Sequence, residues 1–158
     1  IEPSQATELF SRGVELVQLF NQQISVQHPL LPSINKISYV MFRQVKGEVI
    51  KTCTTLKPGR CDRSPCGTGS SANLAIMHKR GLVDEGQQFI TESIIGSQFK
   101  VKLAGVSSMC GRETVLPEIT GRAWIYGTQQ LSIDPSDPFQ EGFVLADTWG
   151  PYIQELDV

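Results

Sequence analysis

The chain has 158 residues, 40% of them hydrophobic, which is enough to bury the core of one domain of ordinary size. Its 14 basic and 16 acidic side chains nearly balance without long runs of one sign, which argues against nucleic acid or an anionic membrane as a partner. No apolar stretch approaches the roughly 20 residues of a membrane-spanning helix. We therefore expect a single soluble lobe over residues 1–158.

The spacing of the cysteines matches neither paired Cys-x-x-Cys zinc ligands nor a dense disulfide framework. They are Cys53, Cys61, Cys66 and Cys110. We expect free thiols, no metal site and a reducing compartment, the cytoplasm. Because the chain opens with Ile1 and shows neither an initiator methionine nor a signal peptide, we also expect that its true start is missing.

Apolar side chains recur near helical spacing over residues 4–25, which predicts an amphipathic helix. A proline-containing loop follows, and then β-branched and aromatic runs at residues 37–42 and 49–56 predict two strands joined as a hairpin through Lys46-Gly47. Helix-forming residues at 71–79 precede Gly81, which is typical of a helix stop.

Most of the remaining chain has the composition of short strands separated by glycine and proline. The predicted strands cover residues 89–95, 99–106, 114–119, 122–126 and 143–145. The pattern predicts an α+β fold, with an antiparallel sheet around one or two helices.

The segment DRSPCGTGSS carries the chemistry, because it leads Cys66 into the start of the predicted helix. Free amide N–H groups and the positive end of a helix dipole favour a thiolate, and they also hold carboxylates. Gly67 and Gly69 let a ligand approach the backbone, and Thr68 adds a hydroxyl donor. With Asp62 for an ammonium group, this set suits an amino acid whose Cα–H faces Cys66.

Two other interpretations of this segment compete. By composition alone it is a turn capped by Ser70 or Ser71. The residues GTGSSA also satisfy the dinucleotide-binding pattern G-x-G-x-x-[GA]. We disfavour that second interpretation, since the flanking strands are expected to form a hairpin instead of a parallel βαβ unit, and no acidic residue closes a second strand about 20 residues onward.

The octapeptide DRSPCGTG at residues 62–69 resembles the second-cysteine motif of the proline racemase family. The likeness extends through ESIIGSQF at residues 92–99, PEITGRAWI at 117–125 and DPFQEGF at 137–143. The family contains proline racemases, hydroxyproline 2-epimerases and trans-3-hydroxyproline dehydratases, which use neither pyridoxal phosphate nor metal. The resemblance implies one lobe of a diaminopimelate epimerase-like fold, a β-barrel-like sheet around a central helix. This chain would be the carboxy-terminal lobe, the first lobe would be absent from it, and the enzyme is expected to be a homodimer.

The resemblance also implies a mechanism in which one cysteine from each lobe faces one side of the substrate Cα, one as thiolate base and the other as thiol acid. Cys66 would be the catalytic residue of this lobe, Gly67 and Thr68 would bind the substrate carboxylate, and Asp62 would contact the ring nitrogen. The expected activity is a racemase or epimerase, without a cofactor, acting on proline or hydroxyproline and inactive as this chain alone.

Two alternatives remain open. A trans-3-hydroxy-L-proline dehydratase needs only one proton abstraction, and the residue that the first lobe supplies opposite Cys66 would decide between dehydratase and epimerase. The chain could instead be an isolated, non-catalytic lobe or binding module, which would expose an apolar surface and self-associate.

Some positions depart from the family pattern. The family's first catalytic cysteine lies in an earlier Met-Cys-Gly-His motif, whereas this chain has only MCGR at residues 109–112. Because that segment follows Cys66 and links two predicted strands, we expect a hairpin turn and not the partner base. Leu56 and Lys36, placed without gaps at pocket positions, are also unusual, so the resemblance does not select among the family's substrates.

Overall fold

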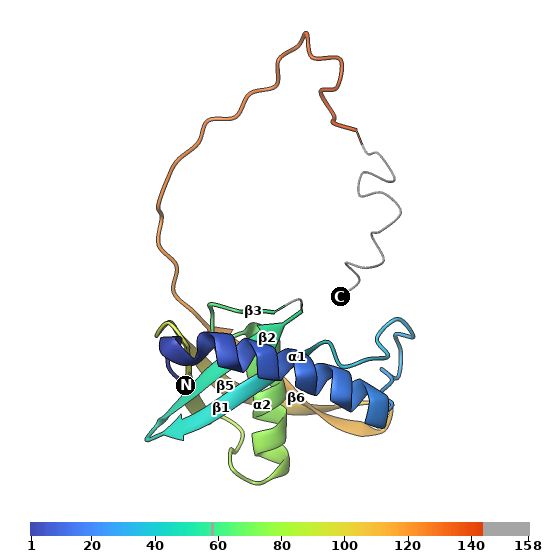
Figure 1. Cartoon of the computed structure of the whole chain (residues 1–158), viewed down its shortest axis with the longest axis vertical. Coiled ribbons are helices and arrows are strands. Elements are labelled where there is room, and N and C mark those ends of the chain that lie inside the picture. Colours follow the sequence, from blue (N-terminus) through green and yellow to red (C-terminus); the bar gives the residue numbers. More distant parts are fainter. Residues whose placement is uncertain (58, 144–158) are drawn as a thin grey trace. The chain divides into compact units, whose positions relative to one another are not determined.

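The structure is a computed structural model that describes residues 1–57 and 59–143. It divides into two units, Ile1–Arg122 and Ala123–Val158. The helices and strands of the described residues belong to the first unit (Figure 1). In chain order they are η1 (Pro3–Gln5), α1 (Ala6–Gln23), β1 (Tyr39–Lys46), β2 (Val49–Leu56), β3 (Arg60–Cys61), α2 (Gly67–Lys79), β4 (Gln88–Ser93), β5 (Gln98–Met109) and β6 (Arg112–Thr120). The predicted α+β class is confirmed.

The amphipathic helix expected near the start of the chain forms as α1, after the single 3₁₀ turn η1. Gly13 and Val17, one turn apart, are buried against the sheet. Asn21, one turn further, exchanges hydrogen bonds of 2.7 and 2.8 Å with the backbone of Ile37. α1 therefore lies fixed across β1 and β2 (Figure 1). Neither α-helix of the described residues is long and apolar enough to cross a membrane.

The strands form one sheet in the order β1-β2-β4-β5-β6, with β3 paired to β2 off this path. The expected hairpin of β1 and β2 is confirmed, and Gly47 in its turn has a φ of 61°. The β5–β6 hairpin turns through Cys110 and Gly111, whose φ angles of 51° and 74° are the left-handed ones that a type I′ turn requires. Within the described residues β1 and β6 each pair on one side only, so this sheet is open.

One strand pair departs from the antiparallel sheet that the sequence predicts. β2 and β4 run parallel, with Thr52 opposite Ser93. Parallel strands need a crossover connection, and here the crossover carries the Cys66 loop and α2. The expectation that a hairpin, and not a parallel βαβ unit, flanks the glycine-rich loop was therefore wrong. One of the two reasons for disfavouring a dinucleotide site is thereby removed.

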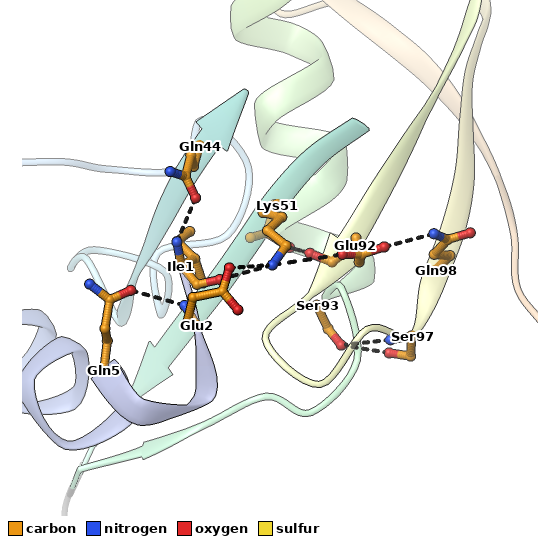
Figure 2. A network of polar contacts seen from close by, with 10 residues as sticks. Ile1, Glu2, Gln5, Gln44, Lys51, Glu92, Ser93, Ser97 and Gln98 are labelled. Carbon is orange, nitrogen blue, oxygen red and sulfur yellow. Dashed lines mark hydrogen bonds and ion pairs between the residues drawn. The ribbon is translucent and has the colours of Figure 1, made fainter. Parts of the chain in front are cut away.

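In a dinucleotide-binding unit, an acidic residue on the strand after the helix binds the ribose, and here that residue would be Glu92 on β4. The carboxylate of Glu92 is instead bonded to polar side chains of the sheet (Figure 2). Lys51, its partner across the parallel pair, places Nζ 4.0 Å from one carboxylate oxygen, and the Gln98 amide donates to the other at 2.7 Å. Lys51 also donates to Glu2 at 2.9 Å, and this bond lowers the pKa of the Glu2 carboxyl. Glu92 thus serves a network that ties the segment before α1 to the sheet.

The two helices cover opposite faces of the sheet. Alternate side chains of a strand point to opposite faces, and on β2 Thr55 lies against Gly13 of α1 whereas Ile50 packs beneath α2. The main core lies on the α2 side, where the Leu74 side chain is completely buried. Its buried members are Ile50, Leu74, Met77, Val83, Val101 and Leu103.

Residues 122–126, expected as a strand, do not form one, so that prediction was wrong. The expected strand at 143–145 lies outside the described residues except for Phe143, which is not in a strand. The described part of the second unit leaves large apolar side chains in solvent, and Ile125 is 94% exposed. The others are Trp124, Tyr126, Leu131, Ile133, Phe139 and Phe143.

Gly13→Ala tests the packing of α1 on the sheet. A Cβ at this position would overlap the side chain of Thr55, which is β-branched and buried and so has little freedom to move. We expect a net loss of about 2 kcal/mol in the free energy of unfolding, despite the better helix propensity of alanine. Ser11→Ala, at an exposed position of the same helix, should change it little in the same denaturant titration. Equal stability of the two variants would contradict the close approach.

Candidate active site

The helix predicted for residues 71–79 begins earlier, at Gly67, so that Cys66 is its N-cap. The backbone of Cys66 has a φ of 66°, which is uncommon for a residue with a side chain. Its sulfur accepts a hydrogen bond from the Gly69 N–H at 3.3 Å, the role that a serine or aspartate oxygen usually fills at a helix start. The thiol therefore lies against the free amides of α2, as the sequence predicts.

A ladder of short-range hydrogen bonds connects Asp62 to Cys66. The Ser64 N–H donates to Asp62 Oδ1 at 2.9 Å, and the Cys66 N–H donates to Ser64 Oγ at 3.0 Å. Asp62 itself is tied to β2, because its N–H donates to the Thr54 carbonyl at 2.9 Å. Asp62 thus shapes the loop with one carboxylate oxygen and has a second oxygen for another partner.

The backbone carbonyl of Pro65 holds the loop against the sheet and α2. Its oxygen accepts hydrogen bonds from Ser70 Oγ at 3.2 Å and from Thr52 Oγ1 at 3.4 Å. On the other side of the loop, Ser97 Oγ donates to the Arg63 carbonyl at 3.1 Å, and Ser97 is in turn bonded to Ser93 at the end of β4 (Figure 2). Bonds from α2, β2 and the β4–β5 turn therefore set the backbone on both sides of Cys66.

The two glycines of the motif have different roles in the structure. Gly67 is exposed, and a Cβ there would meet nothing within 4 Å, so its backbone is open to a ligand. Gly69 is buried, and a Cβ there would overlap the terminal methyl of Met41. Only Gly67, with the exposed Thr68 beside it, fits the expected approach of a ligand, whereas Gly69 makes room for protein atoms.

Tyr39 belongs to the site, although sequence reasoning missed it. Burial raises the pKa of its hydroxyl, the charge of Cys66 raises it further, and a hydrogen bond with Thr68 acts in the opposite direction. Tyr39 opens β1 opposite Leu56 of β2, so the register of the hairpin brings it here. Lys36, placed at a pocket position by ungapped comparison, is an exposed loop residue.

The other cysteines have surroundings that do not favour acid–base chemistry. All four are free, and Cys53 is 1% exposed, with burial the main cause that raises the pKa of its thiol to about 11. Burial likewise raises the pKa of the neighbouring Cys61. Cys110 occupies the exposed turn between β5 and β6, as the hairpin interpretation of MCGR predicts. Cys66 is thus the cysteine that combines a helix start with an adjacent open backbone.

The loop as a whole places open backbone amides beside a thiol. The open amides at Gly67 and Thr68 suit a carboxylate, Asp62 lies in the same loop, and the sulfur of Cys66 lies at the helix start. Among the described residues, no group of three or more His, Cys, Asp or Glu side chains gathers to hold a metal ion.

Comparison with known proteins identifies the family of this chain. The family model for proline racemase matches residues 1–144. The chain belongs to the proline racemase family. Two of its relatives are the 4-hydroxyproline 2-epimerases of Allorhizobium ampelinum and Rhizobium etli, each 48% identical, in alignments that cover 100% and 99% of this chain and 46% of each relative.

Solved structures agree with this membership of the proline racemase family. A hydroxyproline epimerase from Agrobacterium vitis with bound trans-4-hydroxy-L-proline matches with a TM-score of 0.77 and 49% identity, over 97% of this chain and 44% of that one. A probable proline racemase from Agrobacterium radiobacter K84 with bound carbonate matches with a TM-score of 0.77 and 45% identity, over 98% and 46%. These matches confirm the expected diaminopimelate epimerase-like fold, and the chain spans just under half the length of these relatives.

Alkylation should distinguish the thiols. The thiolate is the form that reacts with iodoacetamide, so a pKa of about 11 leaves Cys53 almost unreactive near neutral pH, and its labelling should rise only as the pH approaches that value. We expect Cys66 to be labelled first, as located by peptide mapping, because its sulfur lies at the start of α2, where amide N–H groups favour an anion. Cys110→Ser removes the exposed thiol as a background. Faster labelling of Cys53, of Cys61 or, in the unmodified protein, of Cys110 than of Cys66 would refute this assignment.

Proposed function

We propose that the protein containing this chain is an epimerase that inverts the α-carbon of 4-hydroxyproline, with Cys66 as one of two acid–base thiols. The observation that carries the proposal is the position of Cys66 as N-cap of α2, where the Gly69 N–H binds its sulfur. The relatives named 4-hydroxyproline 2-epimerase, and the trans-4-hydroxy-L-proline bound to the Agrobacterium vitis enzyme, favour hydroxyproline over proline as substrate.

The substrate carboxylate would bind at the open start of α2. Exposed Gly67 and Thr68 present backbone N–H groups there, and the helix dipole adds a favourable field. The ring ammonium would then reach the oxygen of Asp62 that Ser64 does not use. Both charges of the amino acid are thereby balanced while its Cα–H lies toward Cys66.

The proton transfers need no oxidant or cofactor. The Cys66 thiolate takes the proton from Cα, the S–H bond forms as the C–H bond breaks, and the electron pair is delocalised into the adjacent carboxylate. A thiol on the opposite face, supplied by the part of the protein outside this chain, would give its proton to Cα with inverted configuration. In the reverse direction the two thiols exchange roles.

Trans-3-hydroxyproline dehydration would need only the first of these transfers, followed by loss of the 3-hydroxyl. The epimerase names of the relatives favour inversion over dehydration. The chain alone would be inactive, because it supplies groups for one face of Cα. The exposed apolar side chains of residues 124–143 support this view, since they fit a surface that another part of the protein or a second copy covers.

Cys66→Ser in the full-length protein should abolish epimerisation of 4-hydroxyproline, by at least about a hundredfold in kcat, because the hydroxyl is a far weaker acid than the thiol. Exchange of the Cα proton with solvent deuterium should be lost from one face only, as followed by NMR of each enantiomeric substrate. Cys110→Ser, in the exposed β5–β6 turn, is the matched control and should retain activity. Ordinary turnover by the Cys66→Ser protein would exclude Cys66 as an acid–base group.

A planar carboxylate that mimics the flattened Cα, such as pyrrole-2-carboxylate, should protect Cys66 from iodoacetamide in the full-length protein. Gly67→Ala should weaken this protection about tenfold while leaving the melting temperature unchanged, since the added methyl would lie in open space that the ligand needs. The readout is the ligand concentration that halves the labelling rate. Undiminished protection in Gly67→Ala would show that the carboxylate binds elsewhere.

A further inference from the structure

A row of buried hydroxyl groups lies beneath the start of α2. The single hydroxyl hydrogen of Thr52 on β2 is shared between the carbonyls of Pro65 and Glu92, each 3.4 Å from Oγ1. Ser70 on α2 donates to the Pro65 carbonyl at 3.2 Å and lies 3.5 Å from the hydroxyl of Thr91 on β4. These side chains are almost completely buried, and their hydroxyls have partners. They hold the loop before Cys66 on the sheet.

Thr54 is the exception in this row. It is 2% exposed, and its Oγ1 is buried without a hydrogen-bond partner among the described residues. A hydroxyl buried in this way is costly, because it has lost its bonds to water and gained none in return. Valine, which has a methyl group in place of the hydroxyl, would fill the same place without that cost. We therefore look for a hydrogen-bond partner that the Thr54 hydroxyl gains in another protonation state of the site.

The neighbour that changes state is Cys66. Thr54 Oγ1 and Cys66 Sγ lie 3.3 and 3.2 Å from one point, the position that a Cβ on Gly69 would occupy. Met41, paired with Thr54 across the β1–β2 hairpin, covers the same point with its terminal methyl. The hydroxyl and the sulfur therefore both lie beside the Cβ position of Gly69, where the Met41 methyl also packs.

We propose that Thr54 is a positioning residue for Cys66: when Cys66 is a thiolate, the Thr54 side chain rotates about χ1 and its hydroxyl donates a hydrogen bond to the sulfur. A thiol is a weak acceptor and leaves the hydroxyl without a partner, whereas a thiolate is a strong one. A bond made only to the charged form favours that form. The Thr54 hydroxyl and the Gly69 N–H would thereby both stabilise the thiolate form of Cys66. The inference rests on the proposed role of Cys66 as an acid–base thiol.

Other groups act on the same sulfur and are held constant in the test. Tyr39 of β1 interacts with Cys66, and Asp62 and Arg63 precede it in the loop. The first two turns of α2 carry no ionisable side chain, but Arg43 of β1 donates to Asn73 there at 2.8 Å. Glu92 of β4 is paired with Lys51. A change confined to Thr54 therefore leaves the charges around Cys66 unaltered.

The experiment is the pH profile of Cys66 alkylation by iodoacetamide in the full-length protein, followed by peptide mapping. Thr54→Val removes the hydroxyl and keeps the shape, so the pH of half-maximal rate should rise by about one unit and the rate near neutral pH should fall about tenfold. Thr54→Ser keeps the hydroxyl and should stay close to the unmodified profile. The melting temperature of Thr54→Val should not fall, because the hydroxyl it removes has no partner in the thiol state.

Thr55→Val is the matched control. Thr55 is the next residue of β2, is equally buried, faces α1, and donates to the Val40 carbonyl at 3.2 Å. Its replacement should lower the melting temperature and leave the Cys66 profile unchanged.

A Thr54→Val profile that superimposes on that of the unmodified protein would overturn the inference about Thr54 and leave the role of Cys66 standing. Should Cys66 of the unmodified protein fail to react ahead of Cys53, the proposed function fails and the inference fails with it. If Thr54→Val does not fold, Thr54→Ala provides the hydroxyl-free profile.

Discussion

The buried carbonyl of Pro65 is the contact on which the geometry of the site depends. It joins α2 to the sheet, because Ser70 donates to it from the helix and Thr52 donates to it from β2. Cys66 is the next residue and has a backbone angle that few side chains adopt. A backbone held on both sides of a strained residue keeps its side chain in one place, which is what a group that must meet a substrate Cα requires.

The parallel pairing of β2 with β4 explains why that anchor exists. The chain leaves β2, passes through the Cys66 loop and α2, and returns beside β2 as β4, so the start of the helix lies against strands that precede and follow it. At this crossing Ser70 of α2 shares the Pro65 carbonyl with Thr52 of β2, and its hydroxyl lies 3.5 Å from that of Thr91 on β4. Cys66 itself is buried beside these strands, whereas Gly67 and Thr68 next to it are exposed. Rigidity and access thus come from different parts of one loop.

In the proposed reaction, the chain supplies one half of the proton-transfer site. Burial raises the pKa of Cys53 and Cys61, and Cys110 lies in a surface turn, so the chain itself holds no second thiol placed like Cys66. The relatives that it matches are about twice as long, and an α-carbon has two faces to serve. The division of the site between this chain and the rest of the protein is consistent with the apolar side chains that the second unit leaves exposed.

The sequence by itself determined the features that depend on neighbouring residues: the α1 and α2 helices, the β1–β2 hairpin, the turn at Cys110 and the placing of Cys66 before a helix, since periodicity, turn residues and the DRSPCGTG motif are all local. Only the tertiary structure decided the parallel β2–β4 pair, the presence of Tyr39 and Thr54 at the site, and the packing role of Gly69. These features depend on which strands pair and in what register. Residues 122–126 show the same limit, because strand-forming residues make a strand only where a partner edge is present.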